Sequence, residues 1–529
     1  MAVKKNEKKN PRLSAVIAAA VVLIGSIAFM TTSCSSGTIN SSENSGEANS
    51  SNESISDADN TTENSGGDAD SSNENSGGET DNSKQYGDST YSYENITRET
   101  IAEINKTQFF NKLSFWECTF DEGVLAELAP QFNKDFEPFI DFQYCTGVDD
   151  LSFMSKYKNA KTLYFINCGL TDSVASALSE VEAEYVNLSG NPELTQLTLN
   201  TQDLLELDLS GTKVENLDFL ASAQKLYNLN LQNTNVSDLS PIAPLTEIMY
   251  LNLSGSKVNS FATELGCRRL SELYLNGCGL TSSEGLEDYI VLSKLDLGNN
   301  SLTDVSFIAD LTPYLELLDL SGNDITGSDL AFLENAEGMV QLGLDSIDLS
   351  ECQLSFCENM QDLESLLARN CNLTDISGIQ NCTKLRYIVL GFNEISDVSP
   401  LPSFIGIYGV PQYKGILDLT NNQVESIAPL NNYYDMVLLT GNPVSNAEIG
   451  DGFSMDCCMI DYFDGIESSA LIKEPFGLYI SNCPEDKQEE IINIAPYTHF
   501  CTRAEQLEEI ESRYRELRYN DYEEMYLEE

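Results

Sequence analysis

A short strand motif that recurs about every 22 residues is the feature that most constrains the fold of this chain. The motif reads L-x-L and is followed, three places after its second leucine, by a small polar residue or a cysteine. Four consecutive copies begin at Leu229, Leu251, Leu273 and Leu295. A fixed period of this length is typical of a solenoid, in which each coil packs only against its neighbours. Such a fold presents a long surface, which favours binding over catalysis.

The residue three places after the second leucine defines a register that runs through most of the chain. In most coils this residue is Asn, Cys, Thr or Ser, and an apolar residue follows two places later. Most successive register positions are 20 to 24 residues apart. The register positions are Cys118, Cys145, Cys168, Asn191, Thr212, Thr234, Ser256, Cys278, Asn300, Asn323, Ile347, Cys371, Asn393, Asn422 and Asn442.

This register resembles that of the leucine-rich repeat proteins. The second half of many coils, such as Val236-Ser-Asp-Leu239-Ser-Pro-Ile242, resembles the 22-residue repeats of internalin-type bacterial surface proteins. The resemblance implies an α/β repeat: a leucine-rich repeat solenoid with a curved parallel β-sheet, short convex 3-10 or helical segments, and divergent caps. It also implies that the register side chains turn inward and satisfy backbone groups at the strand ends.

Two coils depart from the register. Around residue 347 two frames compete, one ending on Ile347 and the other on Cys352, and we favour the first. The other departure is an insertion, Leu401 to Gly415, that is rich in large apolar and aromatic residues. Insertions in repeat arrays form loops, often on the binding face, so we expect either a contact loop or a folded-back plug. Its candidate binding residues are Phe404, Tyr408 and Tyr413.

The first 34 residues have the order of an export signal. Basic residues precede an apolar run from Leu13 to Met30, and small residues then lead to Cys34. A cysteine in this place resembles the lipidation site of a bacterial lipoprotein signal, which implies acylation of Cys34 and an extracytoplasmic location at the cell membrane. Thr31 stands where that family prefers leucine, so an uncleaved N-terminal anchor and plain secretion are the alternatives.

Residues 35–95 consist almost entirely of Ser, Asn, Gly, Thr and acidic residues, and we predict a disordered tether. The whole chain has a net charge of −55, from 84 acidic and 29 basic residues. So acidic a chain disfavours nucleic acid as a partner and favours cationic ones.

The solenoid is predicted over residues 96–445, and residues 446–529 are interpreted as degenerate repeats followed by a helical C-terminal cap. A coil centred near Phe463 would join the coil of Asn442 to a further strand motif at Leu478-Tyr-Ile480. A helical run is expected from Glu485 to Ile494, and a further one beyond Ala504.

Catalysis, cofactors and metals are not expected. His499 is the one histidine of the chain, and no nucleotide-binding or hydrolase motif stands in a credible context. The C-terminal cysteines lack the spacing of a zinc site. Six cysteines occupy register positions and are predicted to be buried thiols rather than disulfides. They are Cys118, Cys145, Cys168, Cys278, Cys371 and Cys483.

Side chains between the two leucines of L-x-L are expected on the concave face, because side chains alternate across a strand. This face is predicted to be a ladder of Asp, Asn and Ser, with Tyr274 as the single large residue in its centre. A solvated face without a ligand is the alternative. The candidate binding residues here are Tyr164, Asp208, Tyr274, Asp296 and Asp319.

Together these features predict a non-catalytic cell-surface binding protein that recognises another protein or a glycan on a leucine-rich repeat scaffold. One alternative is a structural or adhesive envelope spacer without a single ligand. The other is an enzyme of unrecognised type within residues 446–529.

Overall fold

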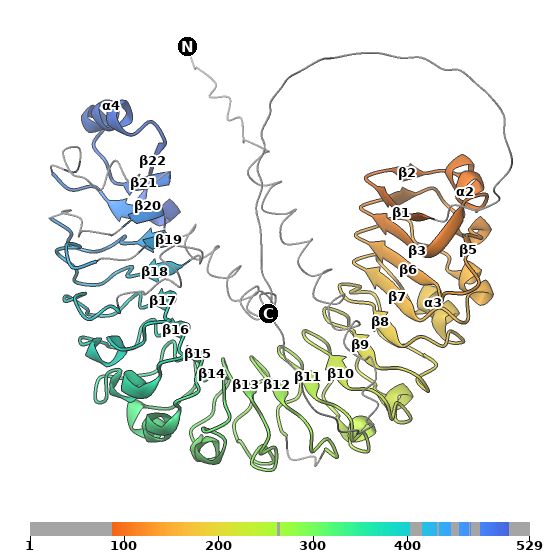
Figure 1. Cartoon of the computed structure of the whole chain (residues 1–529), viewed down its shortest axis with the longest axis horizontal. Helices are drawn as coiled ribbons and strands as arrows, with labels where there is room; N and C mark the ends of the chain where they lie inside the picture. Colours follow the sequence, from red (N-terminus) through yellow and green to blue (C-terminus); the bar gives the residue numbers. More distant parts are fainter. Residues whose placement is uncertain are drawn as a thin grey trace, which may run out of the picture. The chain divides into compact units, whose positions relative to one another are not determined.

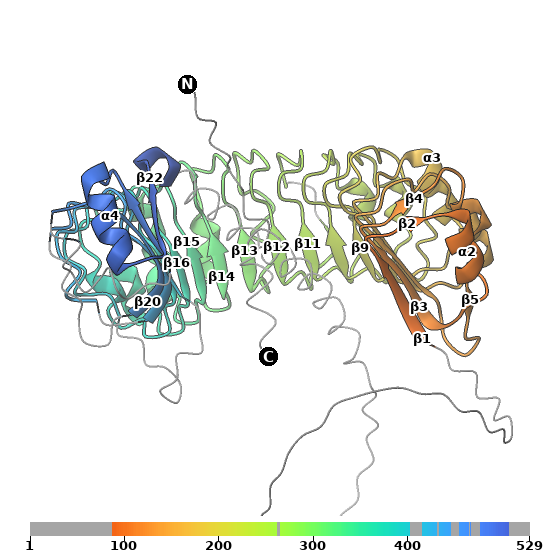
Figure 2. The same ribbon diagram turned by 90° about the horizontal axis from the view of Figure 1, so that it is seen from above.

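The computed structural model describes residues 87–261, 265–402, 415–430, 433–445, 454–464, 466 and 477–506. These residues lie in one compact unit that spans residues 85–507. Within it, twenty strands form a single parallel sheet that runs from β1 at one edge to β22 at the other. The strands line the inner side of the array, and the turns and 3-10 helices lie on its outer side (Figure 1). Seen from above, β1 and β3 lie at one end and β20 and β22 at the other (Figure 2).

The strands of the N-terminal half are longest near the edge of the sheet and shorten to three residues in the regular coils. They are β1 (Gly87–Ser92), β2 (Asn95–Ile96), β3 (Gln108–Trp116), β4 (Thr119–Phe120), β5 (Gln131–Phe132), β6 (Phe139–Gln143), β7 (Thr162–Ile166), β8 (Tyr185–Asn187), β9 (Glu206–Asp208), β10 (Asn228–Asn230) and β11 (Tyr250–Asn252).

The strands of the C-terminal half lengthen again beyond β18. They are β12 (Glu272–Tyr274), β13 (Lys294–Asp296), β14 (Leu317–Asp319), β15 (Gln341–Gly343), β16 (Ser365–Leu367), β17 (Tyr387–Val389), β18 (Ile416–Asp418), β19 (Tyr433–Leu438), β20 (Ser454–Asp461), β21 (Gly477–Ser481) and β22 (Thr498–Cys501).

Short helices connect the strands. In the part of the chain that the structure describes, none has the length and apolar character needed to cross a membrane. The α-helices are α2 (Arg98–Ile104), α3 (Asp172–Ala175) and α4 (Glu485–Ile494). The 3-10 helices are η2 (Leu125–Glu127), η3 (Ser152–Lys156), η4 (Ser176–Leu178), η5 (Asp218–Leu220), η6 (Ser240–Ile242), η7 (Ser306–Asp310), η8 (Gly327–Asn335), η9 (Ser355–Asn359) and η10 (Ser377–Ile379).

The leucines of the repeat form one continuous core. Leu229, Leu251 and Leu273 pair in register across neighbouring strands, and each is completely buried. At the N-terminal end phenylalanines replace the second leucine of the motif, and the rings of Phe115 and Phe142 lie 4.7 Å apart. Burial of apolar surface at each coil is the main stabilising contribution, and every coil depends on its neighbours for it.

Aspartates hold the 3-10 turns on the outer side. The Oδ1 atom of Asp238 accepts a hydrogen bond from the backbone N–H of Ser240 at 2.8 Å. In their own coils, Asp304 accepts the N–H of Ser306 and Asp375 accepts the N–H of Ser377. An Asx turn of this kind fixes the entry into a short helix. The Ser/Thr-Asp pair in the second half of these coils therefore has a structural reason.

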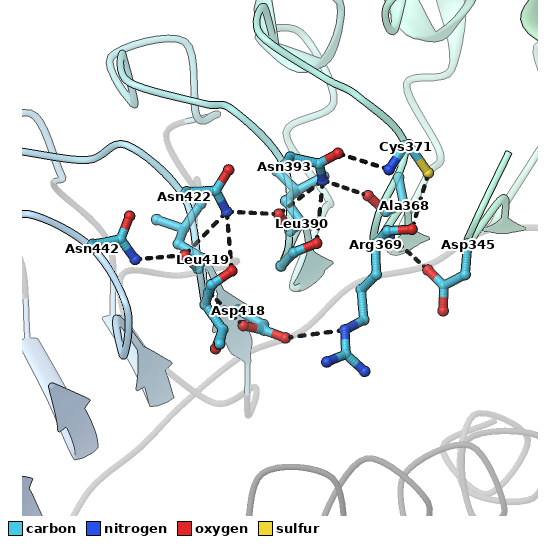
Figure 3. A network of polar contacts seen from close by, with 12 residues as sticks. Asp345, Ala368, Arg369, Cys371, Leu390, Asn393, Asp418, Leu419, Asn422 and Asn442 are labelled. Atoms are coloured by element: carbon cyan, nitrogen blue, oxygen red, sulfur yellow. Dashed lines mark hydrogen bonds and ion pairs between the residues drawn. The ribbon is translucent and has the colours of Figure 1, made fainter. Parts of the chain in front are cut away.

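The register side chains turn inward, as the resemblance implied. Asn393 donates from Nδ2 to the carbonyl oxygens of Ala368 and Leu390, at 2.8 and 2.9 Å, and accepts the N–H groups of Cys371 and Leu373, at 2.8 and 3.1 Å (Figure 3). Each such asparagine thus joins two coils. The same arrangement repeats at Asn191, Asn300, Asn323, Asn422 and Asn442.

The structure decides two points of register. Leu342 pairs with Leu318 and Leu366, and Ile347 is completely buried, so the frame that ends on Ile347 is confirmed. The coil near Phe463 is confirmed as well, because β20 lies between β19 and β21 in the sheet.

The two ends of the sheet extend beyond the expected repeats. Strand β1 begins at Gly87 and pairs with β3, so the folded part starts inside the segment that we assigned to the tether of residues 35–95. Tyr91 explains this, since its ring stacks on Phe115 at 5.4 Å and ties the segment to the core. At the other end α4 spans the expected residues, and β22 adds a strand that the sequence pattern did not predict.

Candidate functional site

The concave face carries two side-chain columns in each regular coil, one on either side of the first buried leucine. In β11, for example, Leu251 is buried while Tyr250 and Asn252 are both partly exposed on the same face. Sequence reasoning considered the residue after this leucine and overlooked the residue before it. The period of two in a strand would have revealed the second column. Its members in β7 to β13 are Thr162, Tyr185, Glu206, Asn228, Tyr250, Glu272 and Lys294.

The second column adds two tyrosines to the N-terminal half of the concave face. Tyr185 and Tyr250 join Tyr164 and Tyr274 there. Tyr227 lies just before β10, and its hydroxyl reaches Glu206 of the second column. We call these five residues the tyrosine strip. The expectation that Tyr274 is the single large residue on the central face is therefore wrong. The rings of Tyr250 and Tyr274 lie 5.5 Å apart at 44°.

Acidic side chains bind two of the hydroxyl groups of the strip. The Tyr227 hydroxyl donates to Oε1 of Glu206, and the Tyr274 hydroxyl donates to Oε2 of Glu272 at 3.1 Å. Lys294 donates to the other carboxylate oxygen of Glu272, also at 3.1 Å. These bonds hold the rings of Tyr227 and Tyr274 in one orientation, so these two side chains have little entropy left to lose when a partner binds.

Burial shifts the pKa values of two charged groups in the second column, Glu206 and Lys294. Glu206 is 4% exposed, and burial raises its pKa, with the Tyr227 hydroxyl acting in the opposite direction. Burial lowers the pKa of Lys294, and Glu272 opposes that effect. Desolvation disfavours the charged form in both cases.

The aspartates predicted as binding residues on the concave face form hydrogen bonds with the backbone of their own coils. Each of these aspartates accepts, through Oδ1, a 2.8 Å hydrogen bond from the backbone N–H of the residue two positions later in the sequence. The pairs are Asp208 with Ser210, Asp296 with Gly298, and Asp319 with Ser321. Asp296 and Asp319 are only 3% and 4% exposed. These carboxylates turn the backbone at the end of their strands. Of the strip tyrosines, Tyr185, Tyr227 and Tyr250 are partly exposed, whereas Tyr164 and Tyr274 are only 9% and 6% exposed.

A charged bridge lies on the same face in the C-terminal half. The Nε atom of Arg369 lies 3.8 Å from Oδ2 of Asp418, two strands further along the sheet (Figure 3). Gly391 stands between them, and a Cβ atom there would lie 3.0 Å from the Asp418 carboxylate. The absence of a side chain at this position lets the ion pair span the intervening strand.

The register cysteines behave as buried thiols in five of six positions. Cys145, for example, donates from Sγ to the carbonyl oxygens of Phe115 and Gln143, at 3.5 and 3.4 Å. The twelve cysteines whose side chains the structure describes are all free thiols. Cys483 is the exception to burial, because it follows the penultimate strand and its Sγ faces the carbonyl oxygen of Pro484.

Some predicted site residues lie outside the described residues. They are Cys34, Phe404, Tyr408 and Tyr413. Within the described ranges, no group of three or more His, Cys, Asp or Glu side chains is placed to hold a metal ion.

Comparisons with known proteins agree with this geometry. Residues 314–336 match the family model "Leucine Rich Repeat", and residues 361–403 match the model "Leucine Rich repeats (2 copies)". The matched segments coincide with coils of the sheet described above. The chain is a leucine-rich repeat protein, and its fold is a leucine-rich repeat solenoid. No curated protein matches the chain.

Three of the solved structures similar to this chain are of bacterial proteins. A leucine-rich repeat protein of Leptospira interrogans has 16% identity and a TM-score of 0.46, covering 76% of this chain and 97% of that chain. Internalin InlF of Listeria monocytogenes has 21% identity and a TM-score of 0.35, covering 66% and 84%. The functional domain of InlJ from the same species, described as including a cysteine ladder, has 18% identity and a TM-score of 0.37, covering 60% and 72%.

Proposed function

We propose that this chain is a non-catalytic, cell-surface binding protein that captures a protein partner on the tyrosine strip of its concave face. The observation that carries the proposal is the grouping of five tyrosines along the sheet from β7 to β12, four of them in strands and Tyr227 just before β10. Tyr185, Tyr227 and Tyr250 are partly exposed, and Tyr164 and Tyr274 are largely buried beside them. Tyrosine is enriched among the residues that dominate binding energy at protein interfaces. A leucine-rich repeat solenoid supplies the extended surface that such an interface needs.

The rigidity of the strip supports binding by preformed contacts. Hydrogen bonds from Tyr227 to Glu206 and from Tyr274 to Glu272 hold two of the rings, and strand pairing holds the backbone beneath them. A rigid aromatic surface loses little entropy on association. The open, strand-lined surface also favours a macromolecular partner over a small substrate, which would need a concave pocket.

The proposed location follows from the N-terminal sequence. An export signal over residues 1–34, acylation of Cys34 and a polar tether would hold the solenoid outside the cell membrane. Metabolic labelling with a fatty-acid analogue tests the anchor, since Cys34→Ser should abolish incorporation of the label and release the protein from the membrane fraction.

The binding proposal is tested with the full chain on cells that produce it. Proximity labelling from the wild type should identify a reproducible surface partner that is lost in the double variant Tyr185→Ser/Tyr250→Ser. Tyr314→Ser is the matched control, because Tyr314 is 63% exposed in the turn before β14 and lies away from the strip. A partner retained by the double variant would contradict the proposal, as would an enriched glycan without any protein. No reproducible partner at all would favour a structural spacer.

A further inference from the structure

The turn after most strands of the sheet has a left-handed backbone at the residue just before the register position. Residues with a side chain adopt this conformation at a cost, and asparagine and glycine tolerate it best. Most coils follow this preference. The residues with positive φ at this position from β7 onward are Asn167, Gly190, Gly211, Asn233, Gly255, Gly277, Asn299, Gly322, Ser346, Asn370, Phe392, Asn421, Gly441 and Asn482.

The first three coils break the preference together. Tyr93, Glu117 and Tyr144 occupy the same left-handed position, with φ of 56°, 49° and 55°. They follow β1, β3 and β6, which are neighbours in the sheet, so the three residues lie side by side along one rim. Strained backbone retained in three adjacent coils points to a use for these side chains beyond the fold.

The side chains at this rim are aromatic and accessible. Tyr93 is 72% exposed and Tyr144 is 42% exposed. Trp116 ends β3 between them, and its ring lies 5.2 Å from that of Tyr144 at 58°. The indole Nε1 of Trp116 donates to Oε1 of Glu117 at 3.2 Å, which places a carboxylate at the edge of the aromatic group. We call Tyr93, Trp116, Glu117 and Tyr144 the aromatic rim.

Aromatic faces beside a carboxylate bind cationic side chains, since the ring quadrupole and the negative charge act in the same direction. The chain shows this chemistry at the equivalent turn of a later coil, where the guanidinium of Arg369 lies over the ring of Phe392 at 5.0 Å. The net charge of −55 also attracts a cationic partner and repels an anionic one.

We propose that the aromatic rim is a second contact site, which binds arginine or lysine side chains of a basic segment of the protein partner. The inference rests on the proposed function and specifies the chemistry of its partner. The tyrosine strip would supply the broad interface, and the rim would select a basic segment at its N-terminal end.

Trp116 provides the measurement, because it is the only tryptophan of the chain. The probe is a synthetic (Gly-Arg)6 peptide, titrated into the full chain while tryptophan fluorescence is recorded. The matched control peptide contains citrulline in place of arginine, which keeps the shape and removes the charge. Saturable change with the arginine peptide and none with the citrulline peptide is expected. Equal change with both peptides, or change only with a neutral oligosaccharide, would overturn the proposal.

The variant Tyr93→Asn/Tyr144→Asn separates binding from stability. It places the residue that other coils use at this turn, so the melting temperature should stay the same or rise. Affinity for the arginine peptide should fall about tenfold or more. Phe392→Asn, at the same turn of a distant coil, is the control and should leave affinity unchanged. Unchanged affinity in the double variant, or a melting temperature several degrees lower, would overturn the proposal.

Failure of this inference can be told from failure of the proposed function. The strip variant Tyr185→Ser/Tyr250→Ser should bind the arginine peptide like the wild type, because the peptide engages the rim alone. Loss of the cellular partner in the strip variant, together with a rim that does not respond to the peptide, would leave the proposed function standing and reject only the rim.

Discussion

Replacement of Asn393 by alanine tests how the solenoid is held together. The asparagine side chain is 5% exposed, and three hydrogen bonds join it to the neighbouring coil while a fourth binds Leu390 in its own coil. Its loss leaves the N–H groups of Cys371 and Leu373 and the carbonyl oxygen of Ala368 without the partner that Asn393 supplied. Each orphaned buried group costs about 1 to 3 kcal/mol. Since water entry reduces the cost of some, we expect a loss of about 3 to 5 kcal/mol in the free energy of unfolding.

Urea denaturation followed by far-UV circular dichroism measures the global loss, and hydrogen exchange measures the local one. Exchange at the amides of Cys371 and Leu373 should accelerate most, because these N–H groups lose their acceptor. Asn381→Ala is the control, since Asn381 is an exposed asparagine in the same coil. Equal destabilisation by both variants, or unaltered exchange at Cys371 and Leu373, would refute the reasoning.

Three further perturbations have defined outcomes. The pKa of Glu206 is about 4.5 in the unfolded chain and is raised in the folded state. Between these two pKa values the folded state keeps a proton that the unfolded state has released, so stability falls as the pH rises. Glu206→Gln should therefore weaken the pH dependence of the melting temperature in this range. Gly391→Ala should cost about 1 to 3 kcal/mol in urea unfolding, because its Cβ would crowd Asp418. Asp238→Ala should lower the melting temperature at neutral pH. That difference should shrink as the pH falls below 3.8, because hydrogen bonds from Ser240 hold the pKa of Asp238 below this value.

The repeat period was enough to predict the fold. Leucines at a fixed spacing can all be buried only if the strands stack in parallel, and the register of Leu229, Leu251 and Leu273 shows that they do. The start of the sheet was harder to predict. β1 contains no L-x-L motif and is held by the stacking of Tyr91 on Phe115, a contact that depends on the folded core.

The candidate site was predicted in part. Tyr164 and Tyr274 were placed on the concave face by the motif itself, whereas Tyr185 and Tyr250 precede the first apolar residue of their coils and were missed. The aspartates Asp296 and Asp319 lie on the predicted face but bind their own backbone, which sequence spacing does not reveal. The left-handed turns behind the aromatic rim needed backbone angles, because a tyrosine at such a turn has no sequence signature.

Site-specific photocrosslinking tests the central claim most directly. A photoreactive phenylalanine analogue would replace Tyr185 or Tyr250 on the strip, or Tyr314 in the turn before β14, in the full chain on producing cells. The account predicts one discrete crosslinked protein from both strip positions and none from Tyr314. Crosslinks from Tyr314 alone, or the same products from all three positions, would contradict a binding site on the concave face.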